Sequence, residues 1–307
     1  MLSSSMFHLV WSAVSLRVSL VTTIHLVLCS TMLSAQSPTL VMTSIRTPRY
    51  ATTTNYVYEF HQKSQSTVSA MGQEMNIALI LHGDLVMSVL EQHGDTVSAE
   101  FTYRNVRISL HGGQTVGLSD TIFISKEPQS ILGVRAVNGR VIKRYALGEI
   151  NLPANLQQLA QNPLAQFDRL LFVPLPPKRY ASLGEQWSYA ENDSASSPAM
   201  NMIVRRDMRY GYQTQCDTLG VKASRMSFAS PKFLLQLDGE QMGLKLNGAG
   251  DGDMRGMVYV DAQSHIPLYG AMQTVITQNL AAVGVESMIM TVTQDVETSI
   301  RLKKAKQ

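Results

Sequence analysis

The chain has 307 residues and a formal net charge of +3, with 26 basic and 23 acidic side chains. A charge balance so near zero argues against nucleic acid as the main partner, because phosphate backbones are bound by clustered basic residues. The length is sufficient for one large core or for two coupled subdomains. A fold of this size does not need disulfides or a metal ion to hold it together.

Residues 1–35 read as a signal peptide. Arg17 precedes the apolar run Val18–Leu28, which is shorter than a comfortable membrane span. This pattern predicts export to the periplasm or the extracellular space. Cys29 raises the alternative of a lipid anchor, but Leu28 stands where a lipoprotein signal has a small residue, so the pattern favours simple cleavage.

Cys216 is the only cysteine after residue 35. No internal disulfide can then form, and an exported chain of this kind must be held together by its core. We expect Cys216 to be a half-buried small residue and not a nucleophile.

Residues 36–150 are predicted to form antiparallel strands after a polar lead-in. Tyr56, Tyr58 and Phe60 alternate with polar residues, and Val97–Leu110 continues the period of two that is typical of strands. Asn138-Gly139 between two apolar runs is a strong signal for a type I′ hairpin, which needs two positive φ angles. Because no helical pattern intervenes, the spacing favours a meander over βαβ units.

Residues 151–178 are predicted to be a helical connector between two β-rich flanks. An apolar stripe recurs there at steps of three and four, through Leu156, Leu159, Ala160, Leu164, Phe167, Leu170 and Leu171. The opposite face is polar and carries Asp168 and Arg169. Pro163 predicts a kink or a break into two short helices.

Residues 179–307 are predicted to form a second antiparallel half. Asn192–Pro198 is polar and reads as a loop, and Gly248–Gly256 is dense in glycine and reads as a turn. Ser287–Leu302 is long and alternating, with a slip of phase that suggests a bulge. The basic tail Arg301–Lys306 is a solvated end or a weak signal for peripheral association with a membrane surface.

The motifs of common enzymes and metal sites are missing from the sequence. Asp251 and Asp253 could offer oxygens to calcium, but the EF-hand spacing fails and a solvated hairpin loop explains them as well. The histidines after residue 35 lack metal-ligand spacing and are His61, His82, His93, His111 and His265. With no G-x-S-x-G and no phosphate-binding glycine loop, we predict no cofactor, no metal and no catalytic residue.

Two features allow either a structural or a binding interpretation. The apolar helix stripe is either ordinary core or a lid over a cavity for an apolar ligand. The many methionines in or beside the strands either fill the core or line a cavity that tolerates lipid. Under the binding interpretation, the candidate ligand contacts are Leu156, Leu159, Leu164, Phe167, Leu170 and Leu171.

Three short motifs carry a resemblance to bacterial secreted β-rich proteins of unknown function. They are Tyr56-x-Tyr58-x-Phe60, the joint from Phe172 to Trp187, and the ending from Gly256 to Pro267. More remotely, a curved antiparallel sheet with an inserted helix is similar to periplasmic lipoprotein carriers of the LolA/LppX kind. That resemblance implies acyl chains held between sheet and helix.

The sequence therefore predicts an all-β protein with one inserted central helix and antiparallel meander sheets that form a curved or barrel-like structure of two similar halves. We expect a signal peptide at residues 1–35, halves at 36–150 and 179–307, and a connector at 151–178. The leading hypothesis is an exported, non-enzymatic protein that binds an apolar or lipid-like ligand between sheet and helix. The alternative is a structural or interaction protein of the cell envelope with a filled core.

Overall fold

The structure of the chain is a computed structural model. It describes residues 44–52, 54–112, 121–125, 128–147, 164–197, 200–218, 220–241, 244–283 and 288–306. These residues belong to one compact unit, residues 43–307. The predicted signal segment 1–35, with Cys29, lies outside the described residues.

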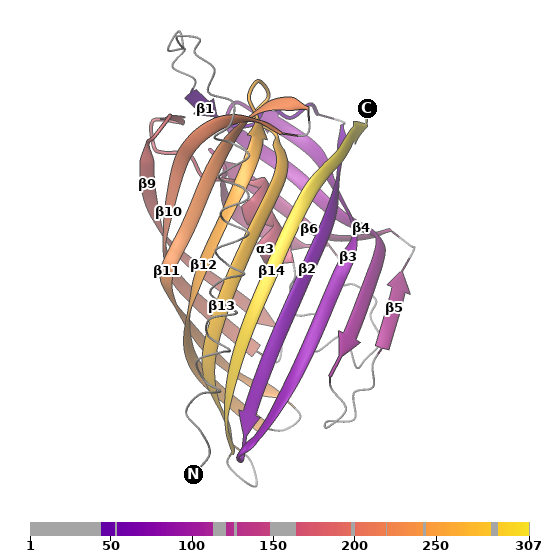
Figure 1. Cartoon of the computed structure of the whole chain (residues 1–307), viewed down its shortest axis with the longest axis vertical. Coiled ribbons are helices and arrows are strands. Elements are labelled where there is room, and N and C mark those ends of the chain that lie inside the picture. Colours follow the sequence, from indigo (N-terminus) through magenta and orange to yellow (C-terminus); the bar gives the residue numbers. More distant parts are fainter. Residues whose placement is uncertain are drawn as a thin grey trace, which may run out of the picture. The chain divides into compact units, whose positions relative to one another are not determined.

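Twelve strands form a single antiparallel sheet that curls into a half-barrel (Figure 1). In chain order they are β2 (Asn55–Ala70), β3 (Gln73–His93), β4 (Thr96–His111), β5 (Thr121–Ser125), β6 (Gln129–Val137), β7 (Arg140–Ala146), β9 (Gln186–Ser197), β10 (Met200–Thr218), β11 (Val221–Gln241), β12 (Leu244–Asp261), β13 (Pro267–Val283) and β14 (Met288–Lys306). Their order across the sheet is β7-β6-β4-β3-β2-β14-β13-β12-β11-β10-β9, with β5 also paired to β4. The prediction of a curved all-β fold is confirmed.

The flanks on either side of the connector share this one sheet. β2 pairs with β14 along nearly its whole length, from Asn55 opposite Lys306 to Ala70 opposite Met290. The first and last long strands therefore lie side by side in the middle of the sheet, as Figure 1 shows in indigo and yellow. The two ends of the strand order, β7 and β9, come from the segments just before and just after the connector.

The core lies on the inner face of the curl. Residues at alternate positions, such as Tyr58, Phe60 and Phe101, are at most 1% exposed, whereas their neighbours in sequence face outward. This is the period-two pattern expected of a sheet with one apolar face.

The connector contributes one helix to the described residues, α3 (Leu164–Leu171). The helix packs on the inner face against β13 and β14 (Figure 1). It ends at Leu171, and the prolines Pro174 and Pro176 follow, which cannot continue a helix. The predicted kink at Pro163 falls outside the described residues.

The predicted Asn138-Gly139 hairpin is confirmed. The two residues have φ angles of 51° and 75°, as a type I′ turn requires, and they join β6 to β7. Met71 and Gly72, with φ angles of 51° and 76°, make the same turn between β2 and β3 at the other end of the sheet.

Two predicted loops are strands in the structure. Asn192–Pro198 belongs to β9 up to Ser197, because its polar residues pair with β10. Gly248–Gly256 lies in the middle of β12, and its glycines alternate along the inner face, where neighbouring side chains cover them. A Cβ on Gly252 would lie 2.6 Å from the ring of Phe233, so the glycine is required by a close approach and not by a turn.

Two further short strands form a second sheet that is hydrogen-bonded separately from the main one. β1 (Ser44–Arg46) pairs with β8 (Tyr180–Ser182), which joins the start of the described chain to the segment after α3. No helix among the described residues is long and apolar enough to cross a membrane.

Candidate functional site

The apolar side of α3 is packed tightly onto the sheet. Phe167, Leu170 and Leu171 are at most 1% exposed. The ring of Phe167 lies 5.1 Å from that of Phe60 and 6.5 Å from that of Tyr103, both edge-on. Of the other predicted contacts, Leu156 and Leu159 fall outside the described residues, and Leu164 is the first residue of α3. The helix therefore fills the inner face of the sheet at one level.

The polar side of α3 is held by an ion cluster that joins the two ends of the sheet. We call this the edge cluster; it consists of Arg144 on β7, Asp168 and Arg169 on α3, Glu191 and Asp193 on β9, and Arg206 on β10. Three arginines face three carboxylates, so the cluster is neutral. Because β7 and β9 are the first and last strands of the sheet, α3 bridges its two edges.

The arginines of the edge cluster donate its hydrogen bonds to the carboxylates. Arg144 Nε donates to Asp168 Oδ2 at 2.6 Å, and Arg169 donates to both Glu191 and Asp193 at 2.7 Å. Arg144 also lies 3.6 Å from Asp193 Oδ1, which pairs the two edges directly. The forked guanidinium suits such double contacts.

Burial and charge set the acidity of the cluster's carboxyls. Burial raises the pKa of Asp168, and it stays above its usual value although Arg144 and Arg169 oppose the effect. Burial acts on Asp193 in the same direction, but there Arg169, Arg206 and Arg144 outweigh it, and the pKa lies below its usual value. Asp193 is thus the carboxylate that the arginines stabilise most clearly.

The segment after α3 is fixed between the same two edges. Trp187 on β9 donates from Nε1 to the carbonyl of Pro174 at 2.8 Å, and Tyr189 donates to the carbonyl of Leu175. From the other edge, the Asn138 side chain donates to Leu175 and Pro176 carbonyls at 3.3 and 3.2 Å. Together with α3, these contacts form a wall across the inner face.

Beyond the wall, the inner face first becomes polar. Cross-strand register places Gln62, Thr298 and Met272 in one row, and Ser64, Val296 and Thr274 in the next. The polar members of these rows, Gln62, Ser64, Thr274 and Thr298, are all buried and form what we call the polar band. Gln62 Oε1 and Thr274 Oγ1 have no hydrogen-bond partner within the described part of the chain.

Farther from the wall, the inner face becomes apolar again. One continuous register runs across five strands from Met202 through Leu237, Gly248 and Leu280 to Met290. The next register inward runs from Val204 through Leu235, Gly250, Gln278 and Val292 to Val68, and Gln278 is its one polar member among these residues. We call the side chains of these two rows the apolar rungs.

The apolar rungs are not fully covered. Met202, Leu237, Leu280 and Met290 are half-buried, whereas inner-face residues beside α3 are buried. Exposure of the inner face therefore increases with distance from α3. Four partly exposed apolar side chains in one row are a surface suited to an apolar molecule.

A cavity of about 560 Å³ lies at the same end of β9–β12, but mostly on the other side of the sheet. Most of its lining, such as Asn201, Ile203, Gln236 and Asn247, alternates with the inward-facing residues of the same strands, although Met202, Leu237 and Gly248 of the rung row also border it. We therefore do not assign it to the inner-face site.

The described histidines and carboxylates form no metal centre. No group of three or more His, Cys, Asp or Glu side chains in the described ranges could hold a metal ion. Asp251 and Asp253, considered above as calcium ligands, are exposed residues of strand β12. The carboxylates that do converge, Asp168, Glu191 and Asp193, are engaged by arginines in the edge cluster.

Sequence reasoning missed the edge cluster. Asp168 and Arg169 were assigned to the polar face of a helix, yet Asp168 is 2% exposed. Asp193 falls within the predicted loop Asn192–Pro198, and Glu191 lies just before it. A usable signal was their alternation with Ala190 and Asn192, which puts both carboxylates on one face of a strand.

No protein-family model and no curated protein matches the chain. Among solved structures, it is similar to lipovitellin, with a TM-score of 0.40 and 11% identity over 84% of this chain. The chain spans about a quarter, 26%, of the lipovitellin chain.

The chain is also similar to bacterial outer membrane proteins. An outer membrane channel from Pseudomonas putida F1 gives a TM-score of 0.26 at 9% identity, covering 87% of this chain and all of that one, 100%. OmpF from Salmonella typhi gives 0.22 at 6% identity, covering 79% of this chain and 97% of that one. Identities and TM-scores this low do not assign a function to the chain.

Proposed function

We propose that this protein is a non-enzymatic binder of an apolar, lipid-like molecule, held on the inner face of the curled sheet beyond α3. The observation that carries the proposal is the row of Met202, Leu237, Leu280 and Met290, which face inward and are only half-buried. Burying such side chains gives about 25 cal/mol per Å² of apolar surface, so a long hydrocarbon chain laid along them would be bound. Methionine side chains adapt to ligands of varied shape.

The polar band supports an amphipathic ligand over a pure hydrocarbon. Gln62 Oε1 and Thr274 Oγ1 are buried and lack a partner among the described residues. An unpaired buried polar atom costs about 1–3 kcal/mol. A hydroxyl, amide or ester group on the ligand would satisfy these atoms while its chain lies on the apolar rungs.

In this proposal α3 is the end wall of the site. Phe167, Leu170 and Leu171 act by packing the helix onto the sheet, because their side chains are already buried. Direct contact of Leu156, Leu159 and Leu164 with the ligand is part of the proposal as well. Export to the periplasm or beyond, with peripheral association with the envelope, rests on the sequence pattern of residues 1–35 and on the basic tail.

One observation favours the alternative of a structural protein with a filled core. Around α3 the interior is closely packed, with the rings of Phe60, Phe101, Tyr103, Phe167 and Phe172 in edge contacts or tilted against one another. If the apolar rungs were also covered in solution, no ligand would be needed.

Native mass spectrometry of the full protein purified from its host distinguishes the two functions. Met290 faces inward and Ile289, its neighbour, is 74% exposed on the outer side, so Met290→Asp and Ile289→Asp form a matched pair. We expect wild type and Ile289→Asp to carry the additional mass of a lipid. Met290→Asp should show at least a tenfold lower bound fraction, because a carboxylate would be buried against the hydrocarbon. A bare mass for the wild type, or equal occupancy in both variants, rules out the proposed function.

A further inference from the structure

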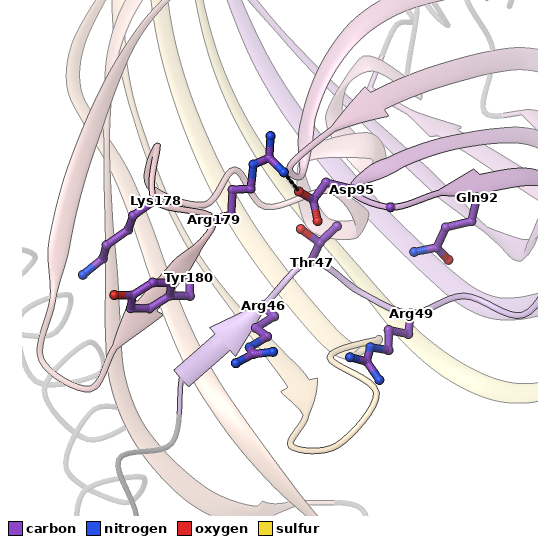
Figure 2. A pocket seen from close by; sticks show the side chains of 9 residues that line it. Arg46, Thr47, Arg49, Gln92, Asp95, Lys178, Arg179 and Tyr180 are labelled. Atoms are coloured by element: carbon purple, nitrogen blue, oxygen red, sulfur yellow. Dashed lines mark ion pairs between the residues drawn. The ribbon is translucent and has the colours of Figure 1, made fainter.

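A second cavity lies at the opposite end of the sheet from the apolar rungs. It has a volume of about 360 Å³, and its lining includes Arg46, Arg49, Gln92, Lys178, Arg179 and Tyr180 (Figure 2). Met75, the register partner of Val68 in the apolar rungs, lies on the same strand as Gln92, and at about 3.3 Å per residue the 17 steps between them span roughly 56 Å. This cavity is therefore separate from the inner-face site, and we call it the cationic pocket.

The walls of the cationic pocket are fixed by backbone contacts. Arg46 is paired with Tyr180 in the small sheet of β1 and β8. Gln92 accepts a hydrogen bond from the amide of Tyr50 and donates to the carbonyl of Pro48, both at 2.7 Å. The amide of Arg49 donates to Ser264 at 2.9 Å. The segment that presents the two arginines is thus anchored on both sides, which lowers the entropy lost on binding.

The charges of the cationic pocket are only partly balanced. Arg179 pairs with Asp95 at 3.0 Å, as the dashed line in Figure 2 marks, and Lys178 pairs with Glu185 at 2.8 Å. Arg46 and Arg49 form no ion pair with any carboxylate of the described residues. Figure 2 shows their side chains extending to the same side of the segment that joins them.

A neighbouring histidine, His265, also feels the two arginines. Burial is the main cause of its lowered pKa; Asp261 opposes the effect, and Arg49 and Arg46 add smaller contributions that lower the pKa. Two guanidinium groups without a carboxylate partner among the described residues create a local field that attracts anions.

We propose that the cationic pocket binds the phosphate group of a phosphomonoester, with Arg46 and Arg49 as its main ligands. A phosphomonoester carries about −1.5 to −2 charges at neutral pH, which matches two free arginines, whereas a carboxylate would leave one of them unbalanced. The guanidinium fork contacts two phosphate oxygens at once. The volume exceeds what a bare phosphate needs, so the rest of the molecule would lie toward Tyr180. This residue is 43% exposed, and Lys178 Nζ lies 4.6 Å from the centre of its ring.

The phosphate could belong to a soluble metabolite or to a lipid headgroup, and two probes distinguish these sources. Glycerol 3-phosphate, titrated into the full chain by calorimetry, tests the soluble form. Sedimentation with vesicles of phosphatidic acid in phosphatidylcholine, compared with phosphatidylcholine alone, tests the headgroup. Binding of glycerol 3-phosphate assigns a soluble ligand, and binding only to phosphatidic acid vesicles assigns the lipid.

The decisive variant is Arg46→Gln/Arg49→Gln. Both side chains are exposed, so the variant should fold, which circular dichroism checks. Its matched control is Arg205→Gln/Arg209→Gln, which removes the same charge from exposed positions of β10. We expect at least a tenfold loss of affinity in the first variant and less than a twofold change in the control. Arg46→Lys/Arg49→Lys keeps the charge without the fork and should recover part of the loss.

The inference is overturned if wild type binds neither probe, or if the pocket variant and the control bind equally. Neither result affects the lipid proposal for the inner face, whose test reads a copurifying mass at Met290. Equal losses in both double variants would show a general charge effect and would also rule out the pocket.

Discussion

Asp168 and Arg169 are adjacent on α3, and they form ion pairs with strands on opposite sides of the connector. Asp168 contacts Arg144 on β7, whereas Arg169 contacts Glu191 and Asp193 on β9. Breaking a buried pair typically costs about 3–5 kcal/mol, because it leaves a charge without a partner. The helix is therefore held in place by charge as well as by its apolar side.

These partnerships could not be predicted from the sequence. The helical spacing correctly put Phe167, Leu170 and Leu171 on one face, since that depends only on the period of the helix. Whether the other face meets solvent or an arginine depends on how far the sheet curls, and no local pattern carries this information. A polar residue in a helix was therefore read as exposed when it is buried.

Asp193 should make the stability of the protein fall in acid. Its pKa in the folded chain lies below the 3.8 of the free side chain, so the unfolded chain binds the proton more tightly. The stabilisation is complete above pH 3.8 and is lost as pH falls through the folded pKa. Asp168 has the opposite effect. Because its pKa in the folded chain is raised, it lowers the stability of the folded chain as pH rises from 3.8.

Asp193→Asn tests this dependence. We predict that thermal unfolding of the wild type shows a clear drop in melting temperature between about pH 5 and about pH 3, and that the drop is smaller in the variant because the asparagine does not titrate. The melting temperature at each pH, relative to that at about pH 5, is the quantity to compare. Parallel curves for the two proteins would show that Asp193 does not contribute to acid unfolding.

At the scale of elements, period-two alternation was a reliable guide and composition was not. The aromatic alternation at Tyr56, Tyr58 and Phe60 and the Asn138-Gly139 turn were predicted correctly, because both depend on local geometry. Gly248–Gly256 was misread as a turn because glycine is common there. In the sheet Gly252 and Gly256 make room for the rings of Phe233 and Phe228, which lie on the neighbouring strand β11.

The Asn138-Gly139 hairpin also docks the segment after α3. The amide of Leu175 donates to the Asn138 carbonyl at 3.1 Å, and a Cβ on Gly139 would lie 2.1 Å from the carbonyl oxygen of Val173. Gly72 has nearly the same φ, yet a Cβ there meets nothing within 4 Å. Comparing substitutions at the two glycines therefore distinguishes the backbone strain of such a turn from the loss of the contact with the wall.

We predict that Gly139→Ala destabilises the protein by at least about 2 kcal/mol, whereas Gly72→Ala costs about 1 kcal/mol from backbone strain alone. Urea unfolding followed by circular dichroism measures both. Equal losses for the two variants would mean that the hairpin does not hold the segment after α3 in place.

At the scale of the whole molecule, a sheet with two free edges needs a device that manages them. Here the edges are linked by the edge cluster and by the segment after α3. The antiparallel meander could be predicted from the sequence, since most strands pair with a strand that is close to them in the chain. The pairing of β2 with β14 and the approach of β7 to β9 could not, because both join residues from distant parts of the chain.

This arrangement explains how one short helix can organise a twelve-stranded sheet. Where α3 bridges the edges, the inner face is closed and filled. Beyond the polar band, the apolar rungs stay partly open, and this is where we place the ligand. The account therefore depends on the edge cluster holding β7 and β9 together.

Distance measurement between spin labels tests this dependence most directly. Labels at Lys143→Cys on β7 and Ala190→Cys on β9 occupy exposed positions, in a chain carrying Cys29→Ser and Cys216→Ser. With Arg169 present, the account predicts one narrow distance distribution. With Arg169→Met, it predicts a broad distribution shifted to longer distances, while Arg255→Met, at an exposed arginine bonded only to Gln273 among the described contacts, leaves it narrow. The same narrow distribution in Arg169→Met would contradict the claim that α3 closes the sheet.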